Sequence, residues 1–347
     1  MSEQRPEVIA RQMPEGVIPL ISIEGAAYDV GREYAEIVMS RWPGFRAYLD
    51  NAWFWRELPG PEKKLVEAHA PHLIDLHRGI TDVAGPPQAQ PPKAAPAKSG
   101  CTSFSLSPAV TLDGVPMSGQ TKDTPLNRIE RYLVLRMKIT GAPGILVLAY
   151  PGEVMGYGFW TTGMTLFRNS MFSSAGCPTG MHYTVMTTIM LSCKSVDEAV
   201  ELVQKHGRNS AGNTLMADAA GNSVSFETNV GGQAFIRDVD GINVHTNHPI
   251  AENTRAYEKY EYADLQPDSI LRYERLGARL EGERGRLTPQ KIFQLLAIHE
   301  GYPLGTCKHR SQIGDITTAA VVVEPTRGLL HVTRGQPCCN WPATYSL

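Results

Sequence analysis

A cysteine preceded by a glycine is the residue in this sequence with the clearest potential for chemistry. Cys101 lies in the segment KSGCTSF, directly after Gly100. Glycine tolerates backbone conformations that are closed to other residues, so a strained peptide bond before the cysteine is feasible. The Cys101 thiol could attack the Gly100 carbonyl, and water would then hydrolyse the resulting thioester. The motif alone is a weak signal, because a cysteine that begins a strand is usually a small apolar residue.

Cleavage at this bond would create its own catalytic base. The new chain would begin at Cys101 and carry both a thiol and a free α-amino group. An α-amine has a reference pKa of about 7.7–8.0, against about 8.5 for a cysteine thiol. Such an amine can accept the thiol proton near neutral pH, so no histidine is required. Cleavage between Gly100 and Cys101 and activation of Cys101 are therefore one hypothesis.

The composition of the chain excludes some classes of partner. The chain has 347 residues, of which 42% are hydrophobic and 20% charged, and its formal net charge is −2. This balance gives no electrostatic reason to expect nucleic acid or an anionic membrane as a partner. The first residues contain no apolar segment of signal-peptide length, and no run of about 18 apolar residues occurs. We therefore expect a soluble cytoplasmic protein.

Six cysteines are scattered along the chain, which is typical of free thiols rather than of a disulfide framework. Cys307 with His309, and the adjacent Cys338 and Cys339, can be imagined as zinc ligands. Their spacing matches none of the usual zinc patterns. The preferred interpretation is that these are thiols without a metal, and neither a metal nor a cofactor is expected.

Cys101 follows a segment that is rich in proline and alanine, PPQAQPPKAAPAKS at residues 86–99. This segment separates a part of the chain with a helical pattern from a part with a strand pattern. This segment is predicted to be extended and solvated. Before it, the apolar spacing predicts a helix from Tyr28 to Trp42 and a second helix after Pro61, which Pro71 kinks or divides. Three adjacent aromatic residues between these helices, at 53–55, are predicted to be mainly core.

After residue 100 the pattern favours strands. CTSFSLS and VPMSGQT are predicted to pair around Asp113-Gly114. Further strands are predicted at 145–150, 184–190, 213–227 and 319–335, and each of the last two ranges contains a hairpin. Ser195 is predicted to cap a helix that ends at Gly207, and Thr288 with Pro289 a helix that ends at Gly301. Hairpin-connected strands with separate helices indicate an α+β fold.

Several motifs in one order make the chain similar to the acyl-coenzyme A:6-aminopenicillanic acid acyltransferase (isopenicillin N acyltransferase-like) family, peptidase family C45 of the N-terminal-nucleophile hydrolases. The resemblance spans most of the chain. The segments that carry it are HLIDLHRGITDVAG, GCTSF, GQTKD, RNSAGNTLMADAAGNSVSFE, VHTNHP, HEGYP, TCKH, TTAAVVVEP and LLHVTRGQP.

The resemblance implies roles for individual residues. Cys101 resembles the family's nucleophile and, through its amine, the base. Asn247 in HTNH resembles the side-chain amide that donates to the oxyanion, and Asp123 in GQTKD the acidic residue near the nucleophile. Arg208 is expected to hold a substrate carboxylate or to cap the preceding helix.

Further residues around these motifs are also compared with the family. Asn213 matches a segment that lines the family's site. His245 and His248 flank Asn247, and one or both are expected to be structural. Thr121 stands where the family usually has an amide, and the segment GMTLFRNSMFSS, with Phe167 and Arg168, replaces a glycine- and asparagine-rich one. These departures affect the substrate pocket.

The fold and domains that the resemblance implies are a four-layer αββα sandwich made of two chains. Residues 1–100 would be the helical propeptide or small α subunit, with the tail 86–99, and residues 101–347 the large β subunit. The two would form one intertwined structural unit, a heterodimer of the cleaved chains.

The leading functional hypothesis is a self-cleaving amidohydrolase that hydrolyses a small N-acyl amide through a Cys101 thioester. An acyltransferase, in which an amine captures the thioester, is the alternative within the same chemistry. A non-catalytic binding protein on the same fold is the alternative of another class. Tyr157 and Trp160 are expected to contact substrate, within an apolar acyl pocket that also draws on Tyr150, Phe159 and Phe172.

Overall fold

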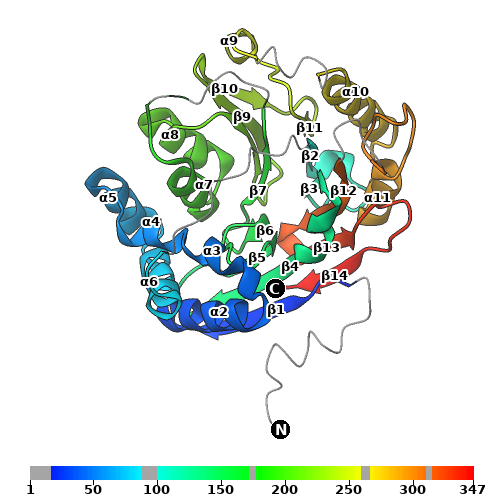
Figure 1. Ribbon diagram of the computed structural model, residues 1–347. Helices are drawn as coiled ribbons and strands as arrows, with labels where there is room; N and C mark the ends of the chain where they lie inside the picture. The colour runs from blue at the N-terminus through cyan, green and yellow to red at the C-terminus, as the bar shows by residue number, and fades with distance from the viewer. Residues whose placement is uncertain (1–16, 88–99, 172–176, 178, 259–265, 310–314) are drawn as a thin grey trace. The chain divides into compact units, whose positions relative to one another are not determined.

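The structure is a computed structural model that describes residues 17–87, 100–171, 177, 179–258, 266–309 and 315–347. The chain forms two compact units (Figure 1). The first unit comprises Met1–Pro96 and Arg131–Gly156 with the last residue, and the second comprises Ala97–Glu130 and Tyr157–Ser346. Most of the proline-rich tail 86–99 lies outside the described residues.

The first unit consists of helices and a small sheet of order β1-β4-β5, in which β1 is parallel to β4 and β4 is antiparallel to β5. The predicted helix after Tyr28 is confirmed as α2, and Pro71 divides the second predicted helix into α5 and α6. The elements are β1 (Leu20–Gly25), α2 (Ala27–Arg41), η1 (Pro43–Phe45), α3 (Arg46–Leu49), α4 (Ala52–Arg56), α5 (Gly60–His69), α6 (His72–Ala84), β4 (Leu133–Ile139) and β5 (Ile145–Ala149).

Two glycines let α2 and α6 pack against each other, side by side in Figure 1. A Cβ atom on Gly31 would lie 1.9 Å from the Leu76 carbonyl oxygen, and one on Gly79 would lie 2.1 Å from the Tyr28 carbonyl oxygen. Both distances are far below van der Waals contact. The backbones of the two helices therefore approach each other at positions that only glycine can occupy.

The second unit contains two antiparallel sheets. One has the order β6-β7-β8-β9-β10, and the six-stranded sheet has the order β11-β2-β3-β12-β13-β14. The strands are β2 (Gly100–Leu106), β3 (Met117–Pro125), β6 (Tyr157–Trp160), β7 (Thr165–Asn169), β8 (Gly212–Ala217), β9 (Ser223–Asn229), β10 (Gly232–Arg237), β11 (Ile242–His245), β12 (Asp315–Glu324), β13 (Leu329–Arg334) and β14 (Ala343–Ser346).

Helices cover the outer faces of the two sheets, so the second unit has four layers. α7 contacts β6 and β7, the strands β2 and β3 contact β7, and α10 and α11 contact β11, β2 and β12 (Figure 1). The predicted αββα sandwich is therefore confirmed. The helices and short turns are α7 (Tyr183–Ser192), α8 (Val196–His206), α9 (Glu252–Arg255), α10 (Gln266–Gly282), α11 (Pro289–Leu296), η2 (Pro108–Val110), η3 (Leu126–Arg131) and η5 (Pro325–Arg327).

Local signals located several elements of this unit correctly. β2 pairs with β3, β8 with β9 and β12 with β13, all antiparallel as predicted. Ser195 accepts a hydrogen bond from the Glu198 N–H as the N-cap of α8, and Gly207 follows that helix with φ of 69°. Thr288 caps α11 as expected, but α11 ends at Leu296 rather than near Gly301.

The strand predicted at Thr184–Met190 is wrong, because these residues belong to α7. The segment TVMTTIM contains only threonine, valine, isoleucine and methionine, and such a composition without charged positions suits a buried strand and a buried helix alike. Most of its side chains are buried, and the His182 side chain caps the helix by accepting from the Thr184 N–H at 3.3 Å. The helix α10 was not predicted at all. Among the described residues, none of the helices has both the length and the apolar character needed to cross a membrane.

Candidate active site

Cys101 lies in β2 with its side chain in the space between the two sheets of the second unit. In the register of β2 and β3 it is paired with Lys122, so the two side chains share one face. Two residues further along β2, Ser103 on the same face donates to Asn169 Oδ1 of β7 at 2.7 Å. The Cys101 side chain is buried, with 3% of the residue exposed.

A cation lies next to the Cys101 thiol. The Lys122 ammonium donates to Cys101 Sγ at 3.6 Å and to the Tyr157 hydroxyl at 2.8 Å. The Arg168 guanidinium lies 5.0 Å from the centre of the Tyr157 ring. Tyr157 was expected at the site from the sequence, whereas Lys122 was not, although it belongs to the motif GQTKD. The strand alternation of GQTKD was the available signal, because it places Lys122 and Asp123 on opposite faces of β3.

The backbone of Cys101 is held on both sides by side chains. Its N–H donates to Asn247 Oδ1 at 2.9 Å. Its carbonyl oxygen accepts from Arg272 Nη1 at 2.7 Å and from Asn169 Nδ2 at 3.2 Å. Arg272 also donates to Asn247 Oδ1 at 2.9 Å, and Asn247 Nδ2 donates to the Ser170 carbonyl at 2.8 Å. The structure thus brings Asn247 to the atom that would become the α-amine.

Asp123 lies on the opposite face of β3, beside Gly100. The Asp123 Oδ1 atom accepts from Thr317 Oγ1 at 2.8 Å, and Oδ2 lies 4.0 Å from Lys308 Nζ. A Cβ atom on Gly100 would lie 2.9 Å from Asp123 Oδ2 and 3.3 Å from Lys308 Nζ. Gly100 itself is part of the strand β2. A glycine is therefore needed here for close approach of a carboxylate and a lysine.

The charges on this face form a network of two cations and three carboxyl groups, all buried. Lys308 Nζ lies 2.7 Å from Asp268 Oδ2 and 3.9 Å from Asp315 Oδ2, and Arg272 Nε donates to Asp268 Oδ2 at 3.0 Å. Asp268 and Arg272 both come from α10, one turn apart. The helix that the sequence analysis missed therefore supplies the cation that contacts the Cys101 carbonyl.

Burial and charge compete at these groups. Burial alone raises the pKa of Asp268, but Arg272 and Lys308 outweigh it and lower the pKa overall. Burial alone lowers the pKa of Arg272, but Asp268 and Asp123 raise it above its usual value. Burial dominates at Asp315 and raises its pKa despite Lys308. Arg272 and Asp268 therefore stay charged as a pair, while Asp315 favours its protonated form more than an exposed aspartate does.

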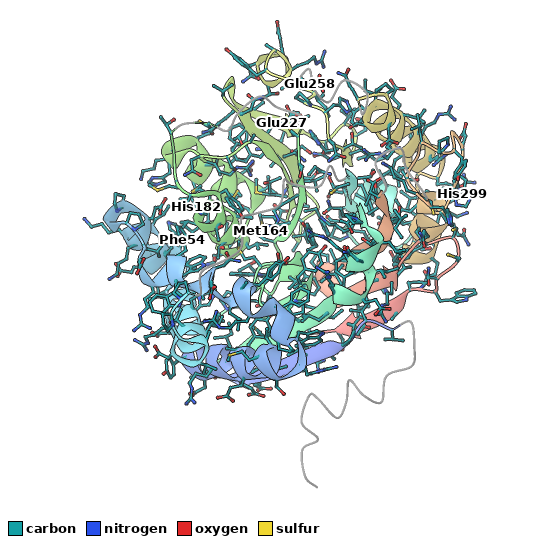
Figure 2. The ribbon with its side chains drawn as sticks, viewed as in Figure 1. Phe54, Met164, His182, Glu227, Glu258 and His299 are labelled. Carbon is teal, nitrogen blue, oxygen red and sulfur yellow. The ribbon has the colours of Figure 1, made fainter. Side chains whose placement is uncertain are left out.

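The histidines beside Asn247 have structural partners. His245 Nε2 lies 2.6 Å from Glu227 Oε1, and the same carboxylate accepts from the Ile250 N–H at 2.7 Å. Glu227 comes from β9 (Figure 2), and this buried pair fixes the segment that carries Asn247. His248 Nδ1 lies 2.9 Å from Ser269 Oγ of α10. Burial lowers the pKa of His248 to about 4, so this imidazole is neutral at pH 7.

The residues expected to bind substrate lie in different surroundings. Arg208 is buried and donates to the Gly212 carbonyl at 2.9 Å and to Thr228 Oγ1 at 2.6 Å, and burial lowers its pKa to about 9. Trp160 is buried within β6. Asn213 Nδ2 donates to Asn169 Oδ1 at 3.0 Å, one hydrogen bond away from Cys101.

The expected acyl pocket stays a prediction. Tyr150 belongs to the first unit, and Phe159 is buried in β6 of the second. Phe172 lies outside the described residues. Binding roles for Arg208, Tyr157 and Trp160 stay predictions.

The sequence matches known proteins at the level of a family. The profile of the family described as acyl-coenzyme A:6-aminopenicillanic acid acyl-transferase matches residues 112–337. This range contains Asp123, Asn247 and Arg272 but begins after Cys101. A search of curated proteins finds no match.

Two solved structures resemble the chain weakly. A variant of conjugated bile acid hydrolase from Clostridium perfringens has 11% identity and a TM-score of 0.47, covering 71% of this chain and 97% of its own. Penicillin V acylase from Agrobacterium tumefaciens has 13% identity and a TM-score of 0.41, covering 70% of this chain and 84% of its own. The family profile, in contrast, covers well over half of the chain. The chain therefore belongs to the acyl-coenzyme A:6-aminopenicillanic acid acyl-transferase family.

Proposed function

We propose that the chain is a precursor that cuts itself between Gly100 and Cys101 and then hydrolyses N-acyl amides through a thioester on Cys101. Family membership makes it an enzyme of acyl transfer, to water or to an amine. The observation that carries the proposal is the combination of contacts at Cys101. Its thiol lies beside a lysine ammonium, and its N–H is held by the Asn247 amide oxygen.

Self-cleavage would begin with attack of Cys101 Sγ on the Gly100 carbonyl carbon. The C–N bond to Cys101 breaks as the C–S bond forms, and the leaving nitrogen takes a proton to become the α-amine. Water then hydrolyses the thioester, which gives Gly100 a carboxylate and restores the thiol. Two features favour this step: the Lys122 ammonium adjoins the attacking sulfur, and Asp123 with Lys308 adjoins Gly100.

The same atoms would serve the substrate reaction after cleavage. The α-amine of Cys101 accepts the thiol proton while the sulfur attacks the acyl carbon of the substrate, and it later donates that proton to the departing amine. Asn247 Oδ1 is placed to orient this amine, since it already accepts from the same nitrogen. Asn247 Nδ2 is a neutral donor suited to the oxyanion, provided that it exchanges the Ser170 carbonyl for the substrate oxygen.

The cleavage hypothesis is tested by denaturing electrophoresis and mass spectrometry of the purified protein. We expect chains of 100 and 247 residues, the second beginning at Cys101. The Cys101→Ala variant should remain a single chain of 347 residues. Cys193→Ala is the matched control, because Cys193 is also buried and lies in the same unit, and it should be cut normally.

Two results would contradict self-cleavage. One is an intact wild-type chain that incubation does not change. The other is a Cys101→Ala variant still cut at the same bond, because a separate protease would then make the cut.

The fate of the acyl group is tested on the processed enzyme with a panel of N-acyl amines and N-acyl amino acids, with and without a competing amine. Hydrolysis predicts release of free acid at a rate that the added amine does not change. Transfer predicts a new amide at the expense of the acid. Turnover of acetamides equal to that of aryl or medium-chain amides would count against an apolar acyl pocket.

A further inference from the structure

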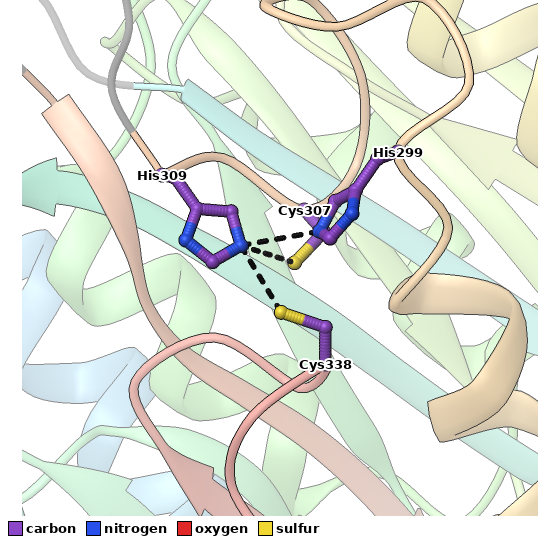
Figure 3. Close-up of side chains that lie close together, drawn as sticks. All are labelled: His299, Cys307, His309 and Cys338. Carbon is purple, nitrogen blue, oxygen red and sulfur yellow. Dashed lines mark hydrogen bonds between the residues drawn. The ribbon is translucent and has the colours of Figure 1, made fainter.

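Four metal-binding side chains converge in the second unit, away from the contacts of Cys101 described above. They are His299, Cys307, His309 and Cys338, and their ligand atoms all lie within 4.8 Å of one another. Figure 3 shows dashed lines that run from His309 to each of the other three residues. From the sequence, Cys307, His309, Cys338 and Cys339 were interpreted as thiols and a histidine without a metal, because their spacing matches none of the usual zinc patterns. His299 was not among these candidates.

The distances within this cluster resemble those of a tetrahedral zinc site. His309 Nε2 lies 3.1 Å from His299 Nε2, 3.1 Å from Cys338 Sγ and 4.0 Å from Cys307 Sγ. With Zn–N of about 2.0–2.1 Å and Zn–S of about 2.3 Å, ligand atoms around a tetrahedral ion lie about 3.3–3.8 Å apart. Small side-chain shifts would bring all four atoms to these separations. Two imidazoles and two thiolates are also the ligand set that zinc prefers.

The adjacent cysteine provides a contrast. Cys339 Sγ faces Gln336, whose carbonyl oxygen lies 3.7 Å away, and the Asn340 side-chain amide. One thiol of the vicinal pair thus joins the cluster and the other does not. His299, His309 and Cys338 are exposed while Cys307 is buried. An ion could therefore enter from solvent and bind the buried Cys307 thiolate together with the three exposed ligands.

We propose that His299, Cys307, His309 and Cys338 bind a Zn²⁺ ion with tetrahedral geometry. All four positions are filled by protein atoms, which is typical of a structural site rather than a catalytic one. The inference goes beyond the proposed function and does not depend on it.

The ion would fix the segment that carries Lys308. Lys308 lies between two of the ligands. Its N–H donates to Thr317 Oγ1 of β12 at 2.8 Å, and its carbonyl oxygen accepts from the Thr317 N–H at 2.9 Å. Its ammonium reaches Asp268 at 2.7 Å and adjoins Asp123. Zinc would therefore join the loop after α11 to the turn after β13 and hold Lys308 as a positioning residue near Gly100.

Metal content of the purified full chain is the direct test. After dialysis against metal-free buffer containing a phosphine reductant, inductively coupled plasma mass spectrometry should find one zinc per wild-type chain. Cys338→Ser should lose most of it, and the matched control Cys339→Ser should retain it. Equal zinc in the wild type and Cys338→Ser, or no zinc in the wild type even after incubation with zinc, would overturn the proposal.

A second measurement on the wild type alone guards against variants that misfold. Zinc is removed with a chelator and replaced by Co²⁺. We expect the intense d–d absorption of tetrahedral cobalt together with near-ultraviolet thiolate-to-cobalt charge-transfer bands. The weak spectrum of octahedral cobalt would refute a tetrahedral site, as would a Cys307–Cys338 disulfide in protein kept under reductant, detected as a mass lower by two hydrogens.

Discussion

At the scale of residues, two cations contact Cys101 from opposite faces of its strand. Lys122 adjoins the thiol and Arg272 donates to the carbonyl oxygen. Both are buried, and Arg272 is paired with Asp268. Lys122 thus lies beside both a thiol and a phenol. The Tyr157 hydroxyl orients the ammonium.

Replacing Lys122 with methionine keeps a long side chain but removes the charge. Because hydrogen bonds to charged groups contribute about 1.5–3 kcal/mol, we expect both self-cleavage and turnover to fall by about 10- to 100-fold. The rates are measured by quantitative electrophoresis of the precursor and by steady-state hydrolysis of an N-acyl amide. Tyr157→Phe, which keeps the cation, should lose less. Wild-type rates in Lys122→Met would exclude a role for this cation.

At the scale of elements, the pleat of β2 and β3 separates two environments. One face carries Cys101 and Lys122 toward the other sheet, and the opposite face carries Asp123 toward α10 and Lys308. The helices α10 and α11 pack against the sheet on the face that carries Asp123. The apolar cluster beneath α10 and α11 includes Phe104 of β2, so the strand that carries Cys101 is also part of the core.

Glycines in helices offer a test at this scale. In α6, Gly79→Ala would place a methyl group 2.1 Å from a carbonyl of α2, so we expect a loss of about 3 kcal/mol in the free energy of unfolding. In α10, Gly277 has open space around its Cβ position. Gly277→Ala should instead stabilise by about 0.5–1 kcal/mol. Denaturant titrations of both variants measure the change in the free energy of unfolding, which should have opposite signs. Equal changes in the two variants would contradict the packing of α2 on α6.

At the scale of the whole molecule, the expected cut does not coincide with the division into compact units. The first unit contains β1 and α2–α6 from before Cys101 and β4 and β5 from after it. Strand β1 is hydrogen-bonded in parallel to β4 along the register from Leu20 and Val134 to Gly25 and Ile139. This unit therefore cannot be completed by either fragment alone.

We accordingly expect the two fragments to stay together after cleavage as a non-covalent heterodimer. Size-exclusion chromatography should give one peak that contains both chains, and only denaturant should separate them. Variants in strand β1 test whether its pairing with β4 holds the fragments together. Ile21 and Ile23 are buried, so Ile21→Asp should weaken retention of the small chain. Ser22 is partly exposed, so Ser22→Asp should weaken retention less. Elution of the large chain alone from the wild type would contradict this assembly.

The sequence by itself determined much of the local structure and singled out the candidate for the chemistry. Cys101 with Gly100, the hairpins β2–β3, β8–β9 and β12–β13, and the caps of α8 and α11 follow from residues adjacent in the chain. Strand alternation, turn residues and capping act over a few residues, so they can be recognised without a structure. The order of motifs also indicated the family that the profile match shows.

Only the tertiary structure decided which distant side chains meet. Arg272 is 171 positions from Cys101, and no local pattern links them. The strand predicted at Thr184–Met190 became α7 because a fully buried apolar segment has no exposed face to reveal its period. The cluster of His299, Cys307, His309 and Cys338 arises from two loops that meet in space. Such contacts depend on how sheets and helices pack, which is a property of the whole fold and not of any short segment.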